Sequence, residues 1–263
     1  MPHWAKRAGL VVLGLLVVLA IALVAIVGIR PFIGPRTRPL TDSTFQATPQ
    51  RVARGEYLAN HVTGCIACHS AIDWDAPGFP PRTGAEGGGL NWADEDLPWL
   101  TSPNITPDTS AGIGALSDDM VARAIREGVH RSGRALFPIM PYLQFRYMSD
   151  EDLASIVVYL RTLKPLASSL PPTEIPFPLS RLINSVPEPV TEPVPEPNRY
   201  DKVSYGEYLV RIGVCRDCHT PMDEQGNSLT HLDLAGGNVF TGPFGNVSSG
   251  RQHHAGPERH SLL

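Results

Sequence analysis

The feature that most constrains this chain is a five-residue pattern, Cys-x-x-Cys-His, that occurs twice. One copy occupies residues 65–69 and the other residues 215–219, and together they contain all four cysteines of the 263-residue chain. A Gly-Glu-Tyr-Leu tetrapeptide precedes each copy, at residues 55–58 and 206–209, so the two stretches repeat with an offset of 150–151 residues. A repeat of this period indicates the duplication of a small domain.

Cys-x-x-Cys-His is the attachment pattern of c-type haem. Two thiols one helical turn apart can each bond to one vinyl group of the porphyrin, and the adjacent histidine can ligate the iron from its proximal side. A zinc ribbon would place its cysteine pairs about 15–20 residues apart, and a thioredoxin-type pair or a structural disulfide would not explain the histidine after each pair. The sequence therefore predicts two covalently attached haem c groups. The residues predicted to hold them are Cys65, Cys68, His69, Cys215, Cys218 and His219.

A long apolar segment lies near the N-terminus. Residues 8–29 contain no charged side chain over 22 positions, and as a helix they would extend about 33 Å, enough to cross the core of a bilayer. The hydrophobic region of a signal peptide is shorter, about 7–15 residues, and ends at a small-residue cleavage site that is not evident here. We expect an uncleaved membrane anchor, with a cleaved signal peptide as the alternative.

The charges around this segment do not fix its orientation. Lys6 and Arg7 before it are nearly balanced by three arginines after it, at positions 30, 36 and 38, so the positive-inside rule gives no clear answer. The predicted haem attachment does fix the orientation, because attachment of this type takes place outside the cytoplasm. We expect a single-pass protein of the cytoplasmic (inner) membrane whose haem domains face the periplasm.

The overall charge argues against a nucleic-acid partner. The chain has 22 basic and 26 acidic residues and a formal net charge of −4. Nucleic-acid-binding domains normally carry a basic surplus or a basic stripe. We expect no contact with nucleic acid, and a membrane contact through residues 8–29.

Composition divides the chain into five parts. The linker is rich in proline, with nine prolines between Pro171 and Pro197. Such a run disfavours helix and central strand, so it forms either a semi-rigid spacer between two blocks or a strap over the surface of one. The predicted parts are an anchor (1–30), a spacer (31–50), a first globular block (51–165), the linker (166–199) and a second block (200–263).

Two helices of the first block are predicted from their ends. Ser117 is a cap residue for a helix that stops at Gly128; its apolar face would comprise Met120, Val121, Ala124 and Ile125. Ser149 is a cap residue for a second helix, with Asp152 at the reciprocal capping position. That helix ends at Lys164-Pro165, and its start has a hydrophobic staple made by Met148 and Leu153.

The sixth iron ligand of the first block should lie well downstream of the motif. Met140 stands between Pro138 and Pro141, which favour an extended loop, and a thioether projected from such a loop suits an axial ligand that raises the reduction potential. Met120 is assigned to a helix face instead, and Met148 to the staple. The alternatives to Met140 are His130 and His61.

Six stretches of the first block carry a resemblance to a known family: residues 54–58, 64–69, 102–108, 112–114, 138–142 and 149–153. They resemble the membrane-anchored multihaem cytochrome c proteins, which include the cytochrome subunits of periplasmic alcohol and sugar-acid dehydrogenases. The resemblance implies all-α cytochrome c domains, with His69 and Met140 as axial ligands. It also implies that an Asn-Ile-Thr-Pro stretch at residues 104–107 lies beside the haem, and that the chain passes electrons towards the respiratory chain.

The second block departs from the first after its motif. From Tyr200 onward 64 residues remain, and the only methionine after His219 is Met222, which is too close to reach the opposite haem face. No counterpart of Met140 follows. We therefore expect an all-α chain with a transmembrane helix, one complete cytochrome c domain and a second, apparently truncated one.

The codons of the tail suggest a reason for this truncation. Read one base out of frame, the codons for Gln252 onward permit Asn-Ile-Thr-Pro-Asp-x-Ser-Gly-Ile, which is close to residues 104–113. We interpret the tail after about Val247 as a frameshift. The alternative is a naturally short domain, whose candidate distal ligands are His231, His253, His254 and His260.

Together these features predict an electron-transfer protein and not an enzyme. It would relay electrons between a periplasmic donor, expected to be a dehydrogenase, and an acceptor of the respiratory chain. The alternative is a dihaem enzyme of the peroxidase or sulfur-oxidising type, with an open or histidine-ligated iron at His219. Spectra of the second haem would distinguish the two, because a five-coordinate iron favours catalysis.

Overall fold

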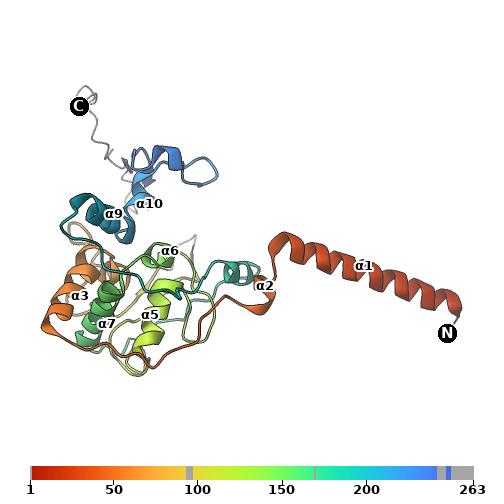
Figure 1. Cartoon of the computed structure of the whole chain (residues 1–263), viewed down its shortest axis with the longest axis horizontal. Coiled ribbons are helices and arrows are strands. Elements are labelled where there is room, and N and C mark those ends of the chain that lie inside the picture. The colour runs from red at the N-terminus through yellow and green to blue at the C-terminus, as the bar shows by residue number, and fades with distance from the viewer. Residues whose placement is uncertain (1, 93–96, 169, 242–246, 250–263) are drawn as a thin grey trace.

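The computed structural model describes residues 2–92, 97–168, 170–241 and 247–249, and the chain is rich in helix (Figure 1). The N-terminal helices are α1 (His3–Val27) and α2 (Arg30–Ile33). The first block contains α3 (Pro49–His61), α4 (Cys65–Cys68), β1 (Leu90–Asn91), β2 (Thr101–Ser102), α5 (Asp118–Glu127), α6 (Tyr142–Phe145) and α7 (Asp150–Thr162). The rest comprises α8 (Leu179–Leu182), the 3-10 turn η1 (Ile183–Ser185), α9 (Lys202–Ile212), α10 (Cys215–His219), η2 (Thr230–Leu232), β3 (Val239–Thr241) and β4 (Val247–Ser249).

The core of the first block forms where α3 crosses α7. Leu58 and Ala59 of α3 and Ile156 and Val157 of α7 are fully buried there. The two helices approach so closely because α3 has a glycine at the crossing, and a Cβ built at Gly55 would overlap the carbonyl oxygen of Ser155. The first residue of the repeated tetrapeptide is therefore a packing requirement in this copy.

The predicted starts of both helices and the end of the first are confirmed, whereas α7 ends at Thr162, two residues before Lys164. The Ser117 side chain accepts a hydrogen bond from Met120 N (3.2 Å) at the start of α5, and α5 stops at Gly128, which has the left-handed conformation that ends helices. Ser149 accepts in the same way from Asp152 N (3.1 Å) at the start of α7. The staple is confirmed as well, since Met148 is fully buried and Leu153 is 5% exposed.

The reciprocal capping bond predicted for Asp152 is wrong. The carboxylate of Asp152 instead accepts two hydrogen bonds of 2.8 Å from the Arg54 guanidinium and one of 2.7 Å from Tyr208 Oη. A reciprocal cap would have the Asp152 carboxylate accept from the backbone N–H of Ser149. That N–H instead donates to Tyr208 Oη at 3.2 Å. A tyrosine from the second block thus completes the cap.

An extended segment, residues 34–48, runs along α5 and buries its polar side. Arg38 donates to both carboxylates on that side, at 2.6 Å to Asp119 Oδ1 and 2.7 Å to Glu127 Oε1. Thr41 N and Phe45 N donate to Asp119 and Asp118. Burial alone would raise the pKa of Asp119, but the hydrogen bonds from Arg38 and Thr41 hold it below its usual value. Residues 34–48, called the N-terminal strap below, fasten the chain beyond α1 to the first block.

The proline-rich segment also lies against the first block. Val194 and Asp150 exchange two hydrogen bonds, Asp150 N to Val194 O (2.9 Å) and Val194 N to Asp150 Oδ2 (3.2 Å). Pro187 is fully buried, and Glu188 accepts from Arg146 at 2.8 Å. Of the two interpretations of this run, the structure supports the surface strap.

Helix α9 of the second block packs against the first block. Ile212 is fully buried in the same apolar cluster as Leu58 and Ile156, and the Arg211 guanidinium lies 4.2 Å from the centre of the Tyr147 ring. The two blocks therefore share one core.

Helix α1 projects away from the rest of the molecule (Figure 1). None of its residues is buried. Its length and composition would allow it to cross a membrane, and a signal sequence near an N-terminus has the same length and composition. It covers residues 8–27 of the apolar segment identified in the sequence (8–29) and ends at Gly28.

Candidate functional site: two Cys-x-x-Cys-His helices

The first motif forms a single helical turn that begins after a sharp bend. Gly64 has φ 67°, a left-handed conformation that costs glycine little, and α4 follows at once. Cys65 is half-buried and Cys68 is exposed, and neither forms a disulfide. Thr63 Oγ1 lies 3.2 Å from Cys65 Sγ. Burial raises the pKa of the Cys65 thiol to about 11, so it is a neutral thiol at neutral pH.

The histidine of this motif is held in one tautomer. His69 Nδ1 lies 2.7 Å from the carbonyl oxygen of Pro103, and a carbonyl can only accept, so Nδ1 carries the proton. The lone pair is therefore on Nε2, the nitrogen available to a metal. Burial lowers the pKa of His69, which favours the neutral form that ligation needs.

The loop that supplies this carbonyl is organised by Asn104. Its Oδ1 accepts from Thr106 N (2.8 Å) and Thr106 Oγ1 (2.7 Å), and its Nδ2 donates to Leu166 O (2.6 Å). The family resemblance implies that the Asn-Ile-Thr-Pro stretch lies beside the haem. In the structure it is a structural loop that fixes the backbone next to Pro103.

Met140 packs against the same apolar cluster as Cys65. Both are partly buried, together with Val62, Ile105 and Leu116. The backbone of Met140 is fixed by its N–H bond to Phe137 O (3.2 Å) and by Tyr142 N donating to its carbonyl (2.8 Å). The donor set fits haem c: two reduced thiols on one turn, a neutral imidazole with Nε2 available, and a thioether on an apolar surface.

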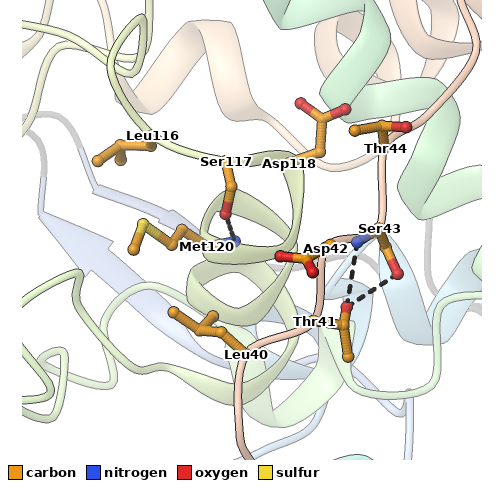
Figure 2. A pocket seen from close by; sticks show the side chains of 9 residues that line it. All are labelled: Leu40, Thr41, Asp42, Ser43, Thr44, Leu116, Ser117, Asp118 and Met120. Atoms are coloured by element: carbon orange, nitrogen blue, oxygen red, sulfur yellow. Dashed lines mark hydrogen bonds between the residues drawn. The ribbon is translucent and has the colours of Figure 1, made fainter.

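The other methionines and histidines of the first block lie elsewhere. Met148 is fully buried, as the staple requires. Met120 is half-buried, not a full core residue, and lines an open groove of about 590 Å³ between the N-terminal strap and α5 (Figure 2). His61 is exposed and lies 5.9 Å from the Tyr57 ring. His130 Nδ1 accepts from Ser132 N at 3.1 Å, so that nitrogen is already engaged.

The second motif repeats the structure of the first. Val214 adopts the left-handed conformation of Gly64, with φ 58°, and α10 follows it. Gly236 N donates to His219 O at 2.7 Å, just as Gly89 N donates to His69 O at 2.7 Å. A short antiparallel pair follows in each block, β1 with β2 and β3 with β4. The structural repeat therefore extends beyond the stretches in which the sequence shows it.

The two motifs lie next to each other. Val62, three residues before Cys65, and Val214, directly before Cys215, belong to the same apolar cluster. The backbones also approach: a Cβ built at Gly213 would lie 3.5 Å from Val62 O. The predicted attachment residues of both copies are thus brought to one region of the molecule.

Tyr208, which connects the second block to the first, was not singled out from the sequence. Tyr208 stands at the same place in the tetrapeptide as Tyr57, yet Tyr57 is 45% exposed while Tyr208 bonds to Ser149 and Asp152. The tetrapeptide repeat marked both tyrosines, but it could not distinguish their environments. Burial raises the pKa of Tyr208, so its phenol stays protonated and can donate.

Of the histidines proposed as distal ligands of the second motif, His231 lies in the described part of the chain. His231 is exposed, in η2. The interpretation of the tail as a frameshift stays a prediction, and residues 250–263 lie outside the described residues. The three further histidines proposed as ligands lie in that range: His253, His254 and His260.

Comparison with known proteins finds relatives that are named as cytochrome c proteins. No model of a known protein family matches it. It is 36% identical over 184 residues to the gluconate 2-dehydrogenase cytochrome c subunit of Pantoea cypripedii and 32% identical over 201 residues to the cytochrome c subunit of the quinone-dependent alcohol dehydrogenase of Gluconobacter oxydans. These matches cover 67% and 72% of this chain but only 39% of each relative.

A third relative is more similar in length. The chain is 28% identical over 214 residues to a diheme c-type cytochrome of Cereibacter sphaeroides, a match that covers 76% of this chain and 68% of the relative. The resemblance drawn from the motifs is confirmed: the chain is a homologue of cytochrome c subunits of dehydrogenases and of a diheme cytochrome c.

Proposed function

We propose that this chain is a membrane-anchored dihaem cytochrome c that transfers electrons from a periplasmic dehydrogenase to the respiratory chain. The observation that supports this best is the packing of α9, the helix that leads into the second motif, against the first block: Ile212 and Val214 join the apolar cluster to which Val62, Cys65 and Ile66 belong. A relay needs its redox centres close together on a rigid body, whereas two independent domains on a flexible linker would not keep them there.

In this proposal the chain's residues hold two haem c groups. Haem c supplies a one-electron iron couple when bound. Cys65 and Cys68 attach the first group, His69 is its proximal ligand, and Met140 is its distal ligand. For the second group the corresponding residues are Cys215, Cys218 and His219.

The chain's own residues set the properties of these sites. Pro103 O fixes His69 in the Nδ1-protonated tautomer, which makes Nε2 the ligand nitrogen. Ligation by both His69 and Met140 would suit the first haem to electron transfer and would disfavour substrate chemistry there. The half-buried apolar surroundings of Cys65 and Met140 exclude water and favour the less charged, reduced state of the site.

The dehydrogenase and the membrane location are parts of the same proposal. Relatives at 30–36% identity are named as cytochrome subunits of gluconate, alcohol and fructose dehydrogenases, so a dehydrogenase is the expected donor. Helix α1 is the proposed anchor, with the blocks after it on the periplasmic side.

A redox titration of the full chain in detergent tests this proposal. We expect two one-electron reductions, rapid oxidation by a quinone analogue, and no turnover with hydrogen peroxide. Peroxide turnover by a chain loaded with both haems, together with a five-coordinate signal, would overturn the relay and support the enzymatic alternative.

A further inference from the structure

Apolar side chains remain exposed where α1 joins the rest of the molecule. We define the foot as residues 29–33 and 177–182. The exposed fraction of the side chain is 82% for Phe177, 62% for Ile33 and 53% for Phe32. Ile29 and Leu182 are exposed by 51% and 45%. Single exposed apolar residues are ordinary, but five in two adjoining segments form a patch of the kind that marks a binding surface.

The foot is a built structure and not a loose tail. Helix α2 contacts α8 and η1, although about 150 residues of sequence separate them, and Figure 1 shows the teal turn of α8 and η1 beside α2. Pro31 of α2 and Ile183 of η1 are buried at this junction. The turn of α8 is fixed by Ser180 N donating to Pro176 O (2.9 Å) and Arg181 N donating to Pro178 O (2.9 Å). The exposed apolar side chains are therefore held on a defined surface.

Basic side chains predominate around the foot. Residues 28–38 and 175–187 contain four arginines and no acidic residue. Arg38 turns inward to Asp119 and Glu127, and Arg36 lies 4.0 Å from Glu188, which leaves Arg30 and Arg181 as the arginines of the foot itself. Apolar side chains flanked by arginines are typical of segments that lie in the headgroup region of an anionic membrane.

We propose that the foot inserts into the headgroup region of the bilayer that α1 crosses. The inference rests on the membrane anchor of the proposed function. Because α2 begins three residues after α1 ends, a bilayer crossed by α1 has its surface close to α2. Its consequence is a fixed orientation. The N-terminal strap and the foot hold the body against the membrane, and α9 and α10 lie at the end of the body far from α2 (Figure 1), facing away from the lipid.

Spin labels on the full, haem-loaded chain test this proposal. The four native cysteines are bound to haem in the proposed function, so an introduced cysteine is the only free thiol. The test variant is Phe177→Cys and its control is Val203→Cys on α9, because both side chains are 82% exposed in the structure. Val17→Cys, in α1, reports on the anchor. Each labelled protein is reconstituted in vesicles of phosphatidylethanolamine and phosphatidylglycerol, and collision with oxygen is compared with collision with a water-soluble nickel chelate.

We expect the oxygen-to-nickel accessibility ratio at position 177 to be several-fold higher than at position 203. If the label at position 17 is exposed to lipid but the ratio at position 177 equals that at position 203, the proposed insertion of the foot is wrong and the anchor stands. The apolar patch would then be available to a protein partner. A water-exposed label at 17 would overturn both. A second test changes an exposed side chain of the foot. Phe32→Ser should raise the collision rate of the nickel chelate with the label at position 177. An unchanged collision rate would contradict a lipid-facing surface shared by the two positions.

Discussion

At the scale of single residues, Met140 has the most specific role in the proposed function, that of an iron ligand. Its thioether lies on the same apolar cluster as Cys65, and flanking prolines keep it out of a helix. Replacing it by leucine preserves volume and removes only the sulfur. The substitution therefore separates ligation from packing.

We predict that Met140→Leu lowers the reduction potential of the first haem by on the order of 0.1–0.3 V, within the roughly 0.8 V range that axial ligands set. The methionine-to-iron charge-transfer absorption of the oxidised protein should disappear with it. Met120→Leu is the control, because Met120 lines the open groove near the N-terminal strap. An unchanged potential in Met140→Leu would assign the ligand to another residue.

His130 makes stability depend on pH. Burial, with the nearby charges of Arg134 and Arg131, lowers its pKa from 6.5 to about 4, and Ser132 N donates to Nδ1, which requires that nitrogen to be unprotonated. Because the folded pKa lies below the unfolded value, the unfolded state binds more protons between these two values.

The free energy of unfolding should therefore fall as the pH is lowered from 6.5 to about 4. His130→Asn should lose this part of the pH dependence, and the exposed His61→Asn should keep it. Urea unfolding at a series of pH values measures the effect. Identical pH profiles for the wild type and His130→Asn would show that another group is responsible.

At the scale of elements, the α3–α7 crossing depends on one glycine. A Cβ at Gly55 would overlap the backbone of Ser155, which cannot move aside as a flexible side chain would. The equivalent residue of the repeat, Gly206 in α9, has open space around the position of its Cβ. The same substitution at the two sites therefore has opposite consequences.

Gly55→Ala should lower the free energy of unfolding by about 3 kcal/mol, the upper part of the range for overpacking. Gly206→Ala should leave it unchanged or raise it by about 0.5 kcal/mol, because alanine is favoured over glycine in an open helix. Denaturant unfolding of both variants gives the comparison. Equal effects at the two positions would contradict the helix crossing described here.

The elements also show how far local sequence can reach. Ser117 and Ser149 were predicted as caps correctly because a cap depends on neighbours within four residues. Asp152 was predicted wrongly because its partners, Arg54 and Tyr208, come from sequence positions far from it. The apolar face of α5 was predicted in part: Val121 and Ile125 are buried, but Met120 and Ala124 are only partly buried. Arg123 and Arg126 are buried as well, because Arg123 donates to Arg38 O of the N-terminal strap and Arg126 pairs with Asp150 of α7.

In the candidate site, too, the local features could be predicted from the sequence and the contacts between distant segments could not. Its covalent residues are contiguous and have one chemical explanation, so the motif alone could indicate them. The Pro103 carbonyl that orients His69 comes from 34 positions away and carries no side-chain signature. The adjacency of the two motifs was likewise hidden, because it depends on packing between helices such as α9 and α6 that are distant in sequence.

At the scale of the whole molecule, the N-terminal strap links the proposed anchor to the haem domains. Arg38 pairs with Asp119 and Glu127, whose side chains are only 6% and 2% exposed. Removing one member of a buried ion pair is costly because a charge is left without a partner. Arg36 offers a matched comparison, since it lies 4.0 Å from Glu188 with both side chains largely exposed.

Arg38→Met should therefore lower the free energy of unfolding by about 3–5 kcal/mol, and Arg36→Met by no more than about 1 kcal/mol. The first variant should also expose the strap to limited proteolysis after Arg36. A loss in Arg38→Met no larger than in Arg36→Met would show that the strap is not fastened through this arginine.

The central claim is that both motifs of this chain carry covalent haem, and the intact mass of the purified chain, matured with a haem-attachment system, tests it most directly. We predict the mass of the polypeptide plus two haems. The variant with both Cys215→Ala and Cys218→Ala should lose one haem and keep the other at Cys65 and Cys68. A wild-type mass with one haem or none, or a variant that keeps two, would contradict the account.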